Sequence, residues 1–179
     1  MMNDLLTHDH SELDELLDRI FAAFEGSTTE QIYQTIDVFW ARLAMHIRAE
    51  HLHLFPAILS MLESPKHPKE NRVPNSEVVR NAIASLHEDH DFFMRELAGA
   101  IKQMRDLRQK NYEGSANRLL TVSETIIAVK GRLETHNERE ETDVYRWAER
   151  LLNQSELADL NGRMQKELDN SPPRFGRIE

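Results

Sequence analysis

The chain has 179 residues, enough for one domain with a sizeable hydrophobic core, and a formal net charge of −9. This acidic charge disfavours nucleic acid as a partner, because nucleic-acid binding depends on lysine and arginine neutralising phosphates. The absence of cysteine excludes disulfide frameworks, thiolate zinc sites and iron–sulfur clusters. With nine histidines in the chain, imidazole and carboxylate are the plausible metal ligands.

Apolar residues recur at helical spacing in the first part of the chain and predict two long helices. The first spans about 4–25. The second begins after the cap signal at 27–29 and runs to about residue 63, and Pro56 should kink it or end its regular part early. The proline-rich segment 64–75 is expected to be a surface loop.

The second part of the chain predicts helices over about 76–110, 116–153 and 155–169, with Ser76 and Ser155 as N-caps, followed by an extended tail. Four long helices with short connections indicate an all-α fold, an antiparallel up-down four-helix bundle with a short C-terminal fifth helix. We expect the bundle over 1–153, and over 154–179 a short helix and tail that pack on the bundle or trail from it.

The sequence shows no sign of contact with a membrane. No stretch approaches the ~18 apolar residues that a membrane span needs. The first residues carry an early acid and no apolar run, unlike a signal peptide. We therefore expect a cytoplasmic protein. A homodimer is one possible oligomeric state.

One motif occurs in both halves of the chain. An Asp-His dipeptide is followed by a histidine and a glutamate four residues apart, first at 9–10 and 46–50 and again at 89–90 and 136–140. Each His/Glu pair lies on one helix face because residues i and i+4 are neighbours there. The six candidate metal ligands are His10, His46, Glu50, His90, His136 and Glu140. Four imidazoles and two carboxylates match the ligands of a two-iron site.

The candidate ligands also lie at similar distances from the predicted turns, which places them in one layer of an antiparallel bundle. They occupy otherwise apolar helix stripes. Burying each of them unpaired costs ~1–3 kcal/mol, and the sum approaches the ~5–15 kcal/mol stability of a whole domain. A metal cluster would satisfy these groups, and a His–Glu network with buried water would do so less completely.

The repeated Asp-His and His-x3-Glu motifs resemble those of the haemerythrin-like, HHE cation-binding family over residues 8 to about 150. The segment 46–50 (HIRAE), with Leu54-Phe55-Pro56 after it, is especially similar. The resemblance implies two non-haem, carboxylate-bridged iron ions held by the six residues above. It also implies binding of O2, NO or a similar small ligand or anion, for sensing, buffering or stress protection.

The sequence departs from the invertebrate oxygen carriers of this family. Their third helix carries H-x3-H, whereas this chain has His87-x2-His90, and their H-x4-D ending is replaced by Glu141 after His136. Dedicated oxygen transport is therefore not expected. Two alternatives remain. The first is a diiron enzyme, either an oxidase or an enzyme that consumes peroxide or NO, and the second is an iron storage or donor protein for iron-centre repair. A helical bundle without a metal site is the simplest alternative.

Other residues near the motif have open roles. His53 and His87 fall on the ligand stripes and are either extra ligands or neighbours of the site. His51 points to a neighbouring helix face, where a solvated side chain is expected. It also occupies the place that Glu141 has in the second repeat, so either residue is a candidate hydrogen-bond partner of a ligand. Glu50-x2-His53 matches one half of a ferritin-type motif, but the absence of a second copy argues against a ferritin-like site.

Overall fold

The computed structural model describes residues 2–63, 74–109 and 115–170, which form α-helices, two short π-helices and connecting turns. The elements in chain order are α1 (Met2–Gly26), α2 (Thr29–Ala49), η1 (Glu50–Leu54), α3 (Phe55–Glu63), α4 (Ser76–Gln109), α5 (Ser115–Arg139), η2 (Glu140–Val144), α6 (Tyr145–Leu151) and α7 (Gln154–Leu168). The described ranges contain no β-strand, so the predicted all-α class is confirmed.

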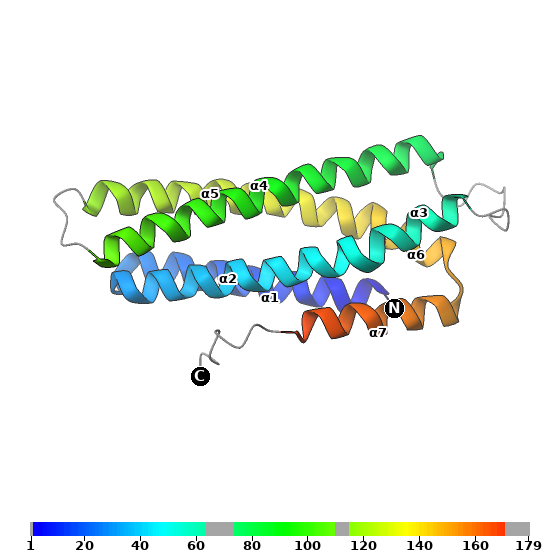
Figure 1. Cartoon of the computed structure of the whole chain (residues 1–179), viewed down its shortest axis with the longest axis horizontal. Coiled ribbons are helices and arrows are strands. Elements are labelled where there is room, and N and C mark those ends of the chain that lie inside the picture. The colour runs from blue at the N-terminus through cyan, green and yellow to red at the C-terminus, as the bar shows by residue number, and fades with distance from the viewer. Residues whose placement is uncertain (1, 64–73, 110–114, 171–179) are drawn as a thin grey trace.

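The helices form four long rods (Figure 1). The first rod is α1, the second is α2 with η1 and α3, the third is α4, and the fourth is α5 with η2 and α6. Consecutive rods run in opposite directions and contact one another in a closed ring, α1 with α2, α2 with α4, α4 with α5, and α5 with α1. In addition, α3 of the second rod contacts α6 of the fourth. The short helix α7 packs against α2, η1 and α1. This is the antiparallel bundle with a short C-terminal helix that the periodicity predicts.

Most predicted helix boundaries hold, but two predicted caps are wrong. Thr28 caps α2 through a capping box with Gln31, as expected. The side chain of Asn75, not Ser76, accepts a hydrogen bond from the first turn of α4. Asn153, not Ser155, caps α7, again through a capping box. In both cases an asparagine one or two residues before the serine accepts the hydrogen bond. Most of the predicted loop 64–75 and the predicted tail lie outside the described residues.

The core consists of two apolar clusters on either side of a polar layer. Along each rod a histidine of the motif stands between residues of the two clusters, as His10 stands between Leu6 and Leu13 and His90 between Leu86 and Phe93. The apolar residues supply the driving force for packing the rods. They also shield the layer from water, so any charge in it experiences a low dielectric.

The second and fourth rods share an irregularity at the polar layer. Each passes through one π-helical turn that begins at the glutamate of the motif, and the N–H groups of Phe55 and Tyr145 bond to the carbonyls of Glu50 and Glu140. The turn belongs to the motif, in line with the frequent occurrence of π-turns at functional sites.

The π-turns change which side chains face inward. An α-helical stripe through Glu50 continues to His53 and Ala57, but both are only partly buried, and Leu54, Phe55 and Ile58 are buried instead. The same change in the fourth rod buries Tyr145 completely. The predicted stripe is therefore wrong beyond Glu50, because the wider turn shifts the inward face by about one residue. In the fourth rod the predicted core residues Trp147 and Leu151 are buried, but the prediction omits Tyr145. In the described part of the chain, no helix combines the length and apolarity that a membrane span requires.

Candidate metal centre

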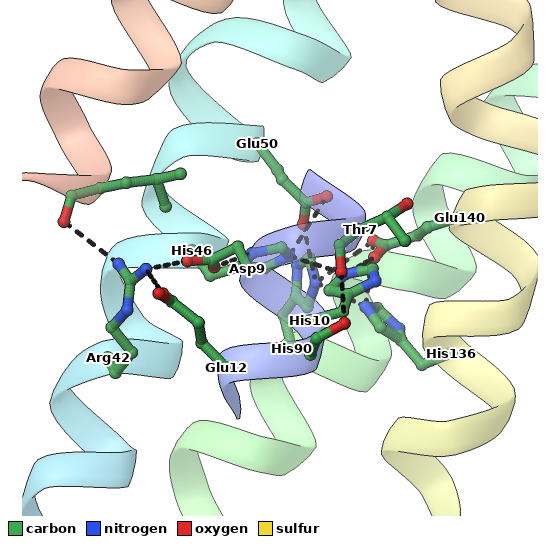
Figure 2. A network of polar contacts seen from close by, with 12 residues as sticks. Thr7, Asp9, His10, Glu12, Arg42, His46, Glu50, His90, His136 and Glu140 are labelled. Carbon is green, nitrogen blue, oxygen red and sulfur yellow. Dashed lines mark hydrogen bonds and ion pairs between the residues drawn. The ribbon is translucent and has the colours of Figure 1, made fainter. Parts of the chain in front are cut away.

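The six predicted ligands meet in the middle of the bundle. Their side chains come from all four rods and converge on one point (Figure 2), and each residue is at most 3 % exposed. Donor atoms of Glu50, His90, His136 and Glu140 lie within 4.8 Å of one another. Those of His10, His46 and Glu140 form a second such group. Glu140 belongs to both groups, so the geometry describes two adjacent cation positions.

The imidazoles form two pairs, one from each hairpin. The Nε2 atoms of His10 and His46 are 3.2 Å apart, and those of His90 and His136 are 3.0 Å apart. Two ligands at a right angle around a metal, each with a bond of ~2.1 Å, would be separated by ~3.0 Å. Each pair is therefore spaced to hold one metal ion.

The two carboxylates connect these pairs. One oxygen of Glu50 is 3.6 Å from His46 Nε2 and the other is 3.4 Å from His90 Nε2. One oxygen of Glu140 is 3.4 Å from His10 Nε2 and the other is 3.0 Å from His136 Nε2. Each glutamate thus presents one oxygen to each imidazole pair, which is the arrangement that a bridging carboxylate needs.

The outer ring nitrogens of the first imidazole pair are held by carboxylates. His10 Nδ1 lies 2.8 Å from a Glu141 oxygen, and His46 Nδ1 lies 2.7 Å from Asp9 Oδ2. A carboxylate accepts hydrogen bonds, so both Nδ1 atoms donate. In their neutral forms His10 and His46 therefore carry bare lone pairs on two Nε2 atoms only 3.2 Å apart. Two such lone pairs repel each other unless a cation, either a proton or a metal, lies between them.

The second imidazole pair is held in a similar way. His136 Nδ1 lies 3.2 Å from Asp89 Oδ2, and His90 Nδ1 lies 2.8 Å from His51 Nε2. His51 and Glu141, which occupy equivalent places in the two repeats, are therefore both hydrogen-bonded to a predicted ligand. Such contacts fix the tautomer and the orientation of a metal-binding imidazole.

Sequence reasoning missed two arginines that support these carboxylates. Arg42 binds both Asp9 and Glu12, a chain of contacts visible in Figure 2. Arg132 Nε donates to Asp89 Oδ1 over 2.6 Å. Each arginine stands four residues before the histidine of its motif, so the repeat is in fact Arg-x3-His-x3-Glu. Extending the comparison of the two halves by one helical turn would have found both.

Sequence reasoning also missed Tyr145, which is completely buried beside the ligands. Its hydroxyl oxygen is 3.0 Å from His10 Nε2, 3.2 Å from Glu50 Oε1 and 3.3 Å from Glu140 Oε2. The equivalent residue in the first repeat is Phe55, also five residues after the glutamate. An α-helical spacing rule places neither residue on the ligand face, and only the π-turn brings them there.

The remaining candidates stay away from the donor atoms. His53 faces α7, where its Nε2 is 3.7 Å from a Glu167 oxygen. His87 is exposed and stacks on His51 with ring centroids 4.1 Å apart. The prediction that both lie on the ligand stripe is wrong, and neither belongs to the two donor groups. His87 reaches the site through its ring contacts with His51, Phe55 and His90.

The four imidazoles differ in pKa because their electrostatic surroundings differ. Burial lowers the pKa of His46, but the carboxylates of Glu50 and Asp9 outweigh burial and raise the pKa well above its usual value. The pKa values of His10 and His136 are raised for the same kind of reason. Burial dominates at His90 and lowers its pKa to about 2. The metal-free site therefore binds protons where a metal would bind.

The two carboxylates are also perturbed. Burial and the charge of Glu140 raise the pKa of Glu50. Burial opposes ionisation of Glu140 too, but the imidazoles of His136 and His10 outweigh burial and hold its pKa well below the usual range. Acid groups this deeply buried need positive partners to remain ionised.

Two of these oxygens lack hydrogen bonds. Glu50 Oε2 and Glu140 Oε1 are fully buried and have no hydrogen-bond partner among the described residues. Glu140 Oε1 lies close to His136 Nε2, but the contact does not have hydrogen-bond geometry. Unpaired buried oxygens that both face the second imidazole pair are costly in a protein alone. A bound cation would satisfy them, so the residues present fit a metal pair.

An open pocket of about 390 Å³ reaches the first imidazole pair from outside. It lies between α1 and the fourth rod, and His10 forms part of its wall. Asp14, Glu134, Glu138 and Glu141 also line it. Acidic walls favour the approach of cations over anions, and the pocket leads to the ligand that Glu141 holds.

Comparison with known proteins gives one family. The model described as "Hemerythrin HHE cation binding domain" matches residues 1–148, which include all six predicted ligands and Tyr145. The search of curated proteins and the search of solved structures found no match.

Proposed function

Because the chain belongs to the haemerythrin HHE cation-binding domain family, we propose that it is a non-haem diiron protein that binds O2, NO or a similar small ligand. In this proposal His10 and His46 hold one iron, His90 and His136 hold the other, and two glutamates bridge them. In this proposal the biological use is sensing, buffering or protection against stress.

The main support is the pair of facing Nε2 atoms in each hairpin. Their separations of 3.2 Å and 3.0 Å suit two ligands of one metal. At His10, His46 and His136 a carboxylate already holds the outer nitrogen, so the inner nitrogen is left as an electron-pair donor. A structural histidine network has no need to aim two bare lone pairs at each other.

We prefer iron over zinc because two imidazole pairs bridged by two carboxylates suit a pair of octahedral metals. Each position receives two imidazole nitrogens and one oxygen from each of the two glutamates. Octahedral metals would retain open positions with this set, whereas zinc in structural sites is closed by four ligands. A bound iron pair would supply redox chemistry and open coordination positions for a small ligand. The protein's own residues orient the donors, supply negative charge and exclude bulk water.

The test is reconstitution of the full-length chain with ferrous iron under anaerobic conditions. We expect two irons per chain after removal of loosely bound metal, and a visible absorption band in the oxidised protein that changes with azide or NO. His90→Ala should lose metal, and the matched control His53→Ala should keep it, because His53 faces α7. Fewer than one iron per wild-type chain, or equal metal content in the two variants, would reject the proposal.

A further inference from the structure

The hydroxyl of Tyr145 lies among donors of one metal position only. The three atoms nearest to it are His10 Nε2 at 3.0 Å, Glu50 Oε1 at 3.2 Å and Glu140 Oε2 at 3.3 Å. These are the atoms assigned above to the position between His10 and His46. The other oxygens of the two glutamates face the His90 and His136 pair. The tyrosine therefore belongs to the first position.

A hydroxyl group alone cannot satisfy these contacts. It carries one hydrogen, which can be donated to only one of the two carboxylate oxygens. His10 Nδ1 already donates to Glu141, so a neutral His10 also offers a lone pair at Nε2. In that state two electron-rich atoms face the phenol oxygen at about 3 Å without a hydrogen between them, and when His10 is protonated one carboxylate oxygen still does. A cation placed among these atoms would turn each repulsive contact into an attractive one.

The separations also suit a metal shell. Ligands at right angles around a metal, with bonds of ~2.1 Å, lie ~3.0 Å apart, and the three distances from the tyrosine oxygen are 3.0, 3.2 and 3.3 Å. The backbone places the tyrosine there, because the π-turn Glu140–Val144 brings residue 145 onto the ligand face. Tyrosine is an established ligand of iron in other proteins.

We propose that Tyr145 is a seventh ligand, whose phenolate oxygen binds the metal held by His10 and His46. The O–H bond breaks when the metal binds, the oxygen keeps the electron pair, and the proton passes to the buffer. This inference rests on the diiron function proposed above. In the first repeat Phe55 has no donor atom, and its ring lies against that of His90, with centroids 6.1 Å apart. The two metals are therefore unequal, because a tyrosine oxygen lies beside the first position and a phenyl ring beside the second.

The experiment uses the full-length ferric protein and reads out spectra and metal content. A phenolate bound to ferric iron gives a charge-transfer band in the visible, with resonance-enhanced ring vibrations. We expect these vibrations in the wild type and expect them to shift when ring-deuterated tyrosine is incorporated. Tyr145→Phe should abolish them and retain two irons per chain. The control Tyr33→Phe should change neither, because Tyr33 lies near the start of α2 with its ring against Arg108.

Phe55→Tyr adds an oxygen at the equivalent place and should strengthen the phenolate signature. Two irons per wild-type chain without isotope-sensitive ring vibrations would overturn the tyrosine assignment alone and leave the diiron proposal standing. Vibrations that persist in Tyr145→Phe would do the same. Failure of the wild type to bind iron would instead overturn the proposed function. The isotope experiment needs no variant, so a folding defect in Tyr145→Phe leaves the inference testable.

Discussion

Replacing Asp9 by asparagine tests whether the residues behind the imidazoles prepare the site for metal. Asp9 is 2 % exposed and accepts a hydrogen bond from His46 Nδ1 over 2.7 Å, and its other oxygen binds Arg42. Asparagine is nearly the same size, but its amide is a weaker acceptor and presents N–H groups to one of these two donors. The change therefore weakens the orientation of His46 without removing a ligand.

The structure predicts how much metal affinity each aspartate substitution should cost. Loss of a group that orients a metal-bound imidazole typically costs ~10–100-fold in affinity, or about 1.4–2.7 kcal/mol. Asp89→Asn makes the same change behind His136, where the distance is 3.2 Å and the aspartate side chain is 10 % exposed. We expect Asp9→Asn near the upper end of this range and Asp89→Asn near the lower end.

Competition with a chelator of known affinity measures the loss directly. Thermal unfolding with excess metal gives a second readout, because metal bound only to the native state stabilises it by mass action. At ~2–4 °C per kcal/mol for a chain of this size, the metal-induced rise in Tm should shrink by roughly 5–11 °C in Asp9→Asn. Glu12→Gln is the matched control, since Glu12 binds the same Arg42 but touches no ligand and is exposed. Unchanged affinity in Asp9→Asn, or a larger loss in Asp89→Asn, would contradict the role assigned to Asp9.

Three further outcomes are expected. Glu50→Gln removes an anionic bridge, so the iron content should fall to about one per chain or less by metal analysis, and retention of two would count against bridging. The raised pKa of His46 means that the metal-free protein holds a proton there, so metal loading at neutral pH should release protons; titration calorimetry should then give different heats in buffers of different ionisation enthalpy, and identical heats would disprove it. Leu160→Ala in α7 should cost about 2–5 kcal/mol in urea unfolding, because Leu160 is fully buried, and a cost near zero would mean that α7 does not stabilise the bundle.

The convergence of the six predicted ligands was foreseeable for a simple reason. Each His/Glu pair is one α-helical turn apart, and the turns place both hairpins at the same level, so inward-facing residues must meet. Their ligand role remains a proposal. The equivalence of His51 and Glu141 was also readable from the repeat, and both hydrogen bonds are present.

The errors begin at the same place in both halves. Beyond Glu50 and Glu140 the prediction continued an α-helical stripe, which put His53 inside and overlooked Tyr145. One π-turn moves His53 off the inward face, and the other brings Tyr145 onto it. No residue type predicts these turns, since one precedes a proline and the other does not. The prediction for His87 was wrong for another reason. A stripe that includes both His87 and His90 extends past the edge of the buried helix face, and His87 lies on the exposed side.

The amino-acid sequence by itself determined the helices, their polar layer and the histidines and glutamates that form it, because these follow from interactions between residues within a few positions of one another. Only the tertiary structure decided which imidazoles pair, which carboxylate oxygen faces which pair, and that a tyrosine stands beside His10. These contacts join residues such as His10 and Tyr145, 135 positions apart. Their geometry depends on how packed rods are rotated and wound, which local spacing does not encode.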